Sequence, residues 1–233
     1  MKKVAIYVEG KTERIFLSEL LQQVFDERKV QIEYYNTETY NKSQVDTIKT
    51  DEPKYYYFLI VDCTGDGQVK SKILEDFPGL FKENYSHIIG LRDLFNPQMK
   101  KMNIDNQKFI NGINSGLPNV IPVKIYFAIQ EIEAWFLAEE IHYQNISSTL
   151  TIEIVNSIAG IDIQKDSTEQ IPHPSVVLDR IYKVGGRKKG YSKNEYIVKD
   201  IVNKLDFSNL YLAVRNRNSS LSELLSCLDG LIP

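Results

Sequence analysis

Acidic side chains recur at the ends of the strands that this sequence predicts. Four strand-like segments are each followed closely by carboxylates: Glu9, Asp62, Asp93, and the pair Glu131 and Glu133. In an open parallel sheet the carboxyl ends of the strands lie along one edge, where such sheets bind ligands. Carboxylates gathered there repel each other unless a cation lies among them, and magnesium takes oxygen ligands together with substrate phosphates. The pattern therefore predicts a magnesium site whose substrate carries a phosphate.

These acidic residues also have a plainer interpretation. Loops after strands are exposed, so a carboxylate in such a loop is often a surface group. Glu13 and Glu131 lie where the dipole of a helix N-terminus favours an anion. The recurrence at successive strand ends favours the metal site, but from this pattern alone both interpretations stay open.

A basic, glycine-rich segment late in the chain is the second candidate for chemistry. Its basic side chains follow each other without an acidic residue between them: Lys183, Arg187, Lys188, Lys189 and Lys193. We predict that Arg187, Lys188, Lys189 and Lys193 contact a nucleic-acid backbone, and that Tyr182 and Tyr191 stack on bases. A lysine run at a helix C-terminus is also favourable in itself and is often simply solvated.

Strands and helices must alternate in the first half of the chain to position these groups. Apolar runs rich in branched residues predict strands near residues 4–8, 32–35, 55–61, 86–91 and 123–129. Helices are expected from Thr12 and over 68–76, the second ending before Pro78. The sequence thus predicts an α/β fold, with a mainly parallel sheet flanked by helices over residues 1–140 and a helical C-terminal appendage over residues 141–233.

Composition narrows the class of protein. Of the 233 residues, 42% are hydrophobic and 25% are charged, which is typical of a folded globular chain and not of a disordered one. The net charge of −3 excludes a global positive field, so a polyanionic partner would need a local basic patch or a metal ion. Two cysteines and the lack of an apolar run of about 20 residues favour a cytoplasmic protein without a membrane partner.

Several motifs together resemble a known family. Residues 8–13 read Val-Glu-Gly-Lys-Thr-Glu, residues 91–95 read Leu-Arg-Asp-Leu-Phe, and residues 130–136 read Gln-Glu-Ile-Glu-Ala-Trp-Phe. The opening resembles that of Toprim catalytic domains, which occur in topoisomerases, bacterial primases and overcoming-lysogenisation-defect nucleases. The whole set, with Tyr191-Ser192-Lys193 in the tail, is closer to an uncharacterised Toprim-related family of bacterial and phage-borne proteins.

The resemblance implies a fold and a set of site residues. Glu9 matches the Toprim glutamate, and Asp93 matches the first aspartate of an Asp-x-Asp pair. Phe95 stands where the second aspartate is expected, which puts a two-metal mechanism in doubt. Glu133 is then the replacement ligand, with Glu131 as a further metal ligand and Glu13 as a base. Asp62 or Asp66, in the turn before the second helix, is an alternative that would compensate for the missing aspartate.

Two main hypotheses follow. The first is a Mg²⁺- or Mn²⁺-dependent nuclease of Toprim type, acting in phage defence or on a mobile element, with the cation on Glu9, Asp93 and Glu133. The second is a Toprim-like module that lost catalysis through Phe95 and binds nucleic acid or a protein. A receiver-like domain phosphorylated on Asp62 is disfavoured, because such domains need an acidic pair after the first strand.

Overall fold

The computed structural model describes residues 1–27, 29–39, 41–44, 53–65, 67–94 and 105–232. Contacts within the chain divide it into two units. Unit 1 comprises Met1–Arg92 and Asn96–Phe127, and unit 2 comprises Asp93–Phe95 and Ala128–Pro233. The boundary that the sequence predicts, at residue 140, lies within unit 2.

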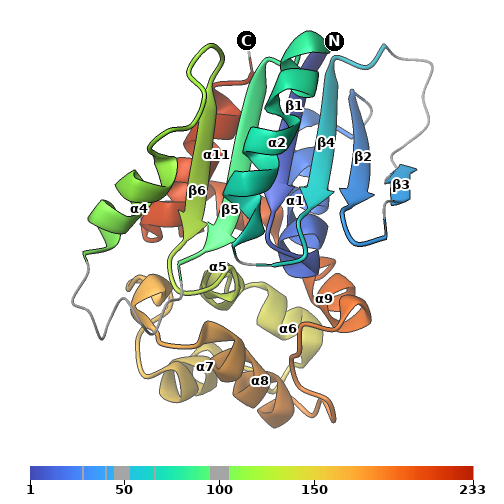
Figure 1. Ribbon diagram of the computed structural model, residues 1–233. Coiled ribbons are helices and arrows are strands. Elements are labelled where there is room, and N and C mark those ends of the chain that lie inside the picture. Colours follow the sequence, from blue (N-terminus) through green and yellow to red (C-terminus); the bar gives the residue numbers. More distant parts are fainter. Residues whose placement is uncertain (28, 40, 45–52, 66, 95–104, 233) are drawn as a thin grey trace. The chain divides into compact units, whose positions relative to one another are not determined.

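A six-stranded sheet has the strand order β3-β2-β4-β1-β5-β6 (Figure 1). The strands are β1 (Lys2–Val8), β2 (Val30–Asn36), β3 (Asn41–Gln44), β4 (Tyr56–Asp62), β5 (His87–Asp93) and β6 (Val123–Ala128). Five of them are parallel, and β3 at the edge runs antiparallel to β2. Val8, the last residue of β1, pairs with Asp62 at the end of β4, so these two carboxyl ends meet at one edge.

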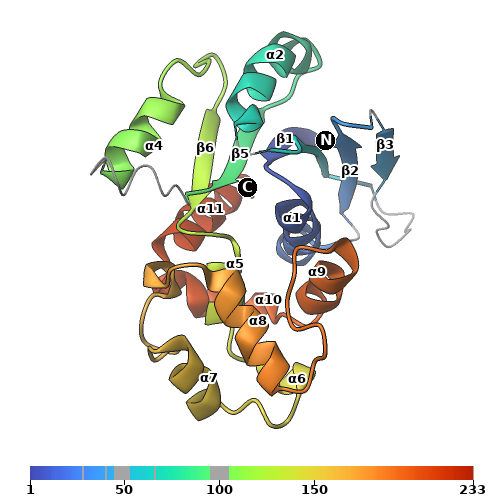
Figure 2. The same cartoon turned by 60° about the horizontal axis from the view of Figure 1, so that its bottom comes forward.

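The helices of unit 1 cover both faces of this sheet. They are α1 (Lys11–Phe25), α2 (Gln68–Lys82) and α4 (Asn106–Asn114). Figure 2 shows α1 on one face and α2 and α4 on the other. Apolar residues of β1 and α1 are buried on the first face, among them Phe16, Leu17 and Leu20. On the second face the Tyr7 hydroxyl donates to Asp76 at 2.9 Å, which ties α2 to β1.

The end predicted for α2 is wrong. The helix does not stop before Pro78 but continues through it to Lys82. Proline lacks an amide hydrogen and crowds the preceding turn, which usually ends a helix. Here the apolar pattern continues beyond the proline, since Val69, Ile73 and Leu80 are all buried. Burial of that face outweighs the local preference of proline.

Unit 2 is almost entirely helical. Its helices are α5 (Glu133–Ala138), α6 (His142–Ile146), α7 (Ile152–Ala159), α8 (Pro174–Val184), α9 (Glu195–Val202), α10 (Phe207–Leu212) and α11 (Ser219–Asp229), with 3₁₀ turns η1 (Thr168–Gln170) and η2 (Val214–Asn216). Trp135 and Phe136 of α5 are fully buried, as are Leu178 of α8 and Leu225 of α11. Helix α5 therefore lies in the core of this unit and fixes the position of Glu133.

The predicted fold class is confirmed: a mainly parallel sheet is flanked by helices, and a helical part follows in the chain. In the described part of the chain, no helix combines the length and the apolar character needed to cross a membrane.

Candidate functional site

Three of the predicted acidic residues lie around one lysine in unit 2. The Lys193 Nζ is 3.5 Å from Asp93 Oδ2, 3.7 Å from Glu131 Oε1 and 3.4 Å from Glu133 Oε2. Asp93 ends β5, the two glutamates come from the start of α5 and the turn before it, and Lys193 lies between α8 and α9. We call the three acidic residues, Asp93, Glu131 and Glu133, the acidic cluster. The recurrence of carboxylates in the sequence thus corresponds, for these three, to a shared position in space.

Glu133 is the most deeply placed member of the acidic cluster. Its side chain is 0% exposed, and its Oε1 accepts a hydrogen bond from the Tyr191 hydroxyl at 2.8 Å. Its Oε2 is buried and, among the described residues, accepts no hydrogen bond. Burial raises the pKa of Glu133, against the nearby charge of Lys193, and the negative charge of Glu131 raises it further. The site therefore holds a carboxyl group whose ionised form is disfavoured by burial even with an ammonium group beside it.

A sharp turn of the backbone and three hydrogen bonds orient the other two carboxylates, those of Asp93 and Glu131. Gln130 has a φ of 67°, which turns the chain sharply between β6 and α5. Asp93 Oδ1 accepts a hydrogen bond from the Ile132 backbone at 2.9 Å, so it anchors the residue between the two glutamates. Glu131 Oε2 accepts from the Ser175 backbone at 3.0 Å and from its hydroxyl at 2.8 Å, at the start of α8. The orientation of each of these two carboxylates is thus fixed by an N–H or O–H donor from another part of the chain.

The loop after α8 carries Tyr191 and Lys193 to the cluster. Gly190 has a φ of 52°, in the left-handed region that favours glycine. The following backbone N–H, of Tyr191, donates to Asp179 Oδ1 at 3.1 Å. A Cβ at Gly190 would lie 2.1 Å from that same Asp179 oxygen, so a side chain there cannot be accommodated without movement.

Gly190→Ala is expected to cost about 1–2 kcal/mol more stability than Gly186→Ala. Gly186 also has a positive φ, of 88°, but a Cβ there meets nothing within 4 Å. Comparing the two variants therefore separates the cost of the contact with Asp179 from the cost of backbone strain. Urea denaturation measures both free energies of unfolding, and equal losses would show that Asp179 yields without cost.

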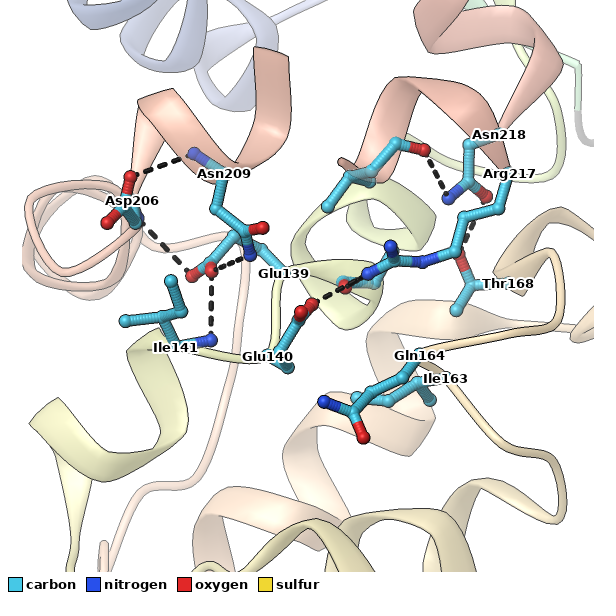
Figure 3. Close-up of polar contacts among 12 residues, drawn as sticks. Glu139, Glu140, Ile141, Ile163, Gln164, Thr168, Asp206, Asn209, Arg217 and Asn218 are labelled. Carbon is cyan, nitrogen blue, oxygen red and sulfur yellow. Dashed lines mark hydrogen bonds and ion pairs between the residues drawn. The ribbon is translucent and has the colours of Figure 1, made fainter. Parts of the chain in front are cut away.

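A second buried carboxylate, Glu139, holds the C-terminal end of α5 (Figure 3). Glu139 accepts hydrogen bonds from the backbone N–H of Ile141 and His142, both at 2.9 Å, and from the Asn209 amide at 2.7 Å. The Asp206 backbone adds a fourth at 3.3 Å. Beside it, Arg217 donates to Glu140 at 2.6 Å, and its charge lies at the same end of the helix. These contacts fix the helix that carries Glu133.

Glu139→Gln is expected to destabilise the protein by about 1–2 kcal/mol at neutral pH, since an amide replaces one acceptor by a donor. Burial would raise the pKa of Glu139, but hydrogen bonds from His142 and Asn209 outweigh it and lower the pKa. A lowered pKa means that this stability is present above the unfolded-state pKa and is lost as the pH falls through the folded-state pKa. The difference in stability between Glu139→Gln and the wild-type protein should therefore shrink below about pH 4. Thermal melts at pH 7 and pH 3.5 test this, with exposed Glu75→Gln as the control; a difference that persists in acid would contradict it.

The predicted basic residues do not act as one group. Lys193 contacts the acidic cluster, and the Arg187 guanidinium pairs with Asp200 at 2.6 Å. Lys188 and Lys189 are exposed and line a cavity. The prediction that Tyr182 and Tyr191 stack on bases is wrong, because both rings are buried, at 0% and 5% exposure.

The remaining predicted site residues belong to unit 1. Glu9 directly follows β1 and is 9% exposed, and Glu13 in the first turn of α1 is 4% exposed. Asp62 at the end of β4 is 1% exposed, and its Oδ2 lies 3.8 Å from Arg14 Nε. Burial raises the pKa of Asp62, although a hydrogen bond from the Thr64 backbone and the charge of Arg14 oppose it. Asp66 and Phe95 lie outside the described residues.

Two residues of the site were missed as partners of the carboxylates: Tyr191 and Ser175. Their contacts with Glu133 and Glu131 span 58 and 44 positions in the chain. The Tyr-x-Lys element at 191–193 was the available signal, since both of its ends reach the acidic cluster. Within the described ranges, no group of three or more histidine, cysteine, aspartate or glutamate side chains could hold a metal ion in this conformation.

The fold is shared with at least one solved structure. A hypothetical protein from Pyrococcus horikoshii OT3 has a TM-score of 0.53 and 14% sequence identity, over 98% of this chain and 100% of that one. A "putative cell surface hydrolase" from Lactobacillus plantarum WCFS1 has a TM-score of 0.29 and 13% identity, over 94% of this chain and 97% of that one, which is too low for a structural argument.

A search of curated proteins finds no match. A family model, by contrast, matches residues 8–210, a span that includes every predicted site residue. The chain therefore belongs to the family described as Domain of unknown function (DUF4276).

Proposed function

We propose that this protein is a Mg²⁺- or Mn²⁺-dependent phosphodiester-cleaving enzyme with its metal ligands in the acidic cluster. One observation carries the proposal: three carboxylates surround a single ammonium group, and one of them has a buried oxygen that accepts no hydrogen bond from the described residues. Carboxylate oxygens are the ligands that hard divalent cations prefer.

Metal binding would require Lys193 to leave the centre of the cluster. The carboxylate oxygens lie 3.4–3.7 Å from the lysine nitrogen, whereas magnesium is bound by oxygen at about 2.0–2.1 Å. The Lys193 side chain is 47% exposed and belongs to a loop, so it has solvent to move into. Asp93, Glu131 and Glu133 would then close around the cation that replaces the ammonium group.

The chain's own residues have distinct tasks in this proposal. Ser175 and Tyr191 hold Glu131 and Glu133 in fixed orientations, as partners of metal ligands commonly do. Lys193, displaced from the carboxylates, would carry a positive charge towards a bound phosphate. A divalent cation held by Asp93, Glu131 and Glu133 would supply Lewis-acid chemistry and would lower the pKa of a water bound to it.

The resemblance adds residues that stay predictions. It assigns Glu9 as a further metal ligand and Glu13 as a base, and it suggests a role in phage defence or on a mobile element. Glu9→Ala tests the first of these through loss of the metal-dependent rate.

Cleavage of labelled single- and double-stranded DNA and RNA, with 1–5 mM Mn²⁺ or with EDTA, tests the proposal. We expect cleavage that needs the metal and falls at least about 100-fold in Glu133→Gln. Glu153→Gln is the matched control, because Glu153 also lies in the first turn of a helix but is exposed. Equal cleavage by the two variants would point to a contaminating nuclease and contradict the proposal.

A second candidate is a module that binds nucleic acid or a protein without catalysis. The position of Lys193 favours it, because the ammonium group already offsets part of the charge of the three carboxylates without a metal. Under this hypothesis Mn²⁺ does not change the melting temperature of the protein, and no nucleic acid is cleaved in its presence.

A further inference from the structure

A cavity of about 460 Å³ lies between the basic segment and the start of α9. Its lining comprises Arg187, Lys188, Lys189, Ser192, Asn194, Tyr196 and Ile197. This volume is within the range of small-molecule sites, which hold a ligand by a few well-placed polar groups. All of these residues belong to unit 2.

The charge inside this cavity is positive. Arg187 is balanced by Asp200, but within the described part of the chain no carboxylate forms an ion pair with Lys188 or Lys189. The nearest acidic residue in sequence to Asn194 is Glu195, and its carboxylate pairs with Lys199 at 3.0 Å. Two lysine charges are therefore left to attract an anion into the cavity.

The start of α9 adds to this attraction. Asn194 caps the helix by accepting a hydrogen bond from the Tyr196 backbone at 3.0 Å. Asn194 and Tyr196, at the positive end of this eight-residue helix, thus line the same cavity as the two lysines. A phosphate group matches both features.

Tyr196 supplies a different kind of surface. Its side chain is 79% exposed, although large aromatic side chains of unit 2 such as Tyr143, Tyr182 and Trp135 are fully buried. An exposed ring at the edge of a positively charged cavity is the arrangement with which proteins bind single strands, because an unpaired base stacks on the ring while the cationic groups hold the backbone.

We propose that this cavity binds single-stranded nucleic acid, with a backbone phosphate at Lys188 and Lys189 and a base on Tyr196. The inference rests on the proposed function only for what happens to the bound strand afterwards. Binding itself requires no metal, so it is measured in EDTA.

Fluorescence anisotropy with a labelled ten-nucleotide single strand, at several salt concentrations, tests the inference. Each phosphate contact contributes about 0.7 to the slope of log affinity against log salt for a single strand. Because both lysines are assigned to one phosphate, Lys188→Gln with Lys189→Gln should reduce this slope by about 0.7. Lys108→Gln with Lys165→Gln, two exposed lysines elsewhere, is the control and should leave the slope unchanged. Equal reductions in both double variants would overturn the proposal.

Tyr196→Ala and Tyr196→Phe separate stacking from charge. The alanine variant should weaken binding about 5- to 150-fold, whereas the phenylalanine variant keeps the ring and should bind as wild type does. Equal losses in both variants, or affinity for a ten-base-pair duplex at least as high as for the single strand, would overturn the assignment.

Failure of this inference differs from failure of the proposed function. Glu133→Gln should bind the strand with wild-type affinity in EDTA, because it alters only the acidic cluster. A wild-type protein that binds the strand but never cleaves it leaves the cavity assignment standing and removes the nuclease. Metal-dependent cleavage by a protein whose lysine and tyrosine variants bind the strand as wild type does would remove the cavity assignment and leave the nuclease standing.

Discussion

Substituting Glu133 by glutamine is expected to abolish the rise in melting temperature that Mn²⁺ causes in the wild-type protein. A ligand at 100 times its Kd stabilises the folded state by about 2.7 kcal/mol, which for a chain of this size corresponds to about 5–10 °C. Glu133 supplies the buried oxygen that accepts no hydrogen bond from the described residues, so its loss removes the ligand that is held most rigidly.

The same substitution should raise the melting temperature of the metal-free protein at neutral pH. The pKa of Glu133 is raised by burial, so the ionised side chain costs stability above its folded-state pKa and costs none below the unfolded-state value of about 4.5. Glutamine mimics the protonated form, and the difference should therefore vanish in acid. Differential scanning fluorimetry with and without Mn²⁺ measures both effects. An undiminished Mn²⁺ response in Glu133→Gln would remove Glu133 from the metal site, and Glu153→Gln should respond as wild type does.

Lys193→Met is expected to have the second large effect. It leaves three carboxylates without the ammonium group that lies 3.4–3.7 Å from each of them. Removing one partner of a fully buried pair costs about 3–5 kcal/mol, and because Lys193 is 47% exposed, solvent screening reduces the expected loss to about 2–3 kcal/mol. The loss should shrink as the pH falls and Glu133 takes up a proton.

Mn²⁺ should restore the stability that the protein loses in Lys193→Met. With Lys193 gone, the cation no longer has to displace an ammonium group, so the Mn²⁺-induced shift should exceed that of wild type while cleavage becomes slower. Lys199→Met is the matched control, because exposed Lys199 pairs with half-buried Glu195 at the surface and should change stability by less than about 0.5 kcal/mol. A smaller Mn²⁺ shift in Lys193→Met than in wild type would count against displacement of the lysine.

The sequence predicted the sheet because its signals are local. Short runs of branched apolar residues occur wherever a strand is buried on both faces, and the structure has strands at all five predicted places. Pro78 shows the limit of such signals, since helix α2 passes through it when the surrounding face is buried. The edge strand β3 lies in a polar segment without a clear period, and only its pairing with β2 defines it.

The candidate site was partly predictable for the same reason. Asp93, Glu131 and Glu133 follow strands, and the order of parallel strands brings such residues to one edge. The contacts of Tyr191, Ser175 and Lys193 depend on how helices pack dozens of residues later, which no local pattern records. Lys193 was expected on nucleic acid because its sequence neighbours are basic, yet its nitrogen lies among carboxylates.

A crystal structure of the protein soaked in Mn²⁺, with anomalous diffraction data, tests the metal assignment most directly. We predict an anomalous peak bounded by oxygens of Asp93, Glu131 and Glu133, with the Lys193 nitrogen displaced towards solvent. Crystals that show no such peak, with that nitrogen still 3.4–3.7 Å from the three carboxylates, would contradict the proposal.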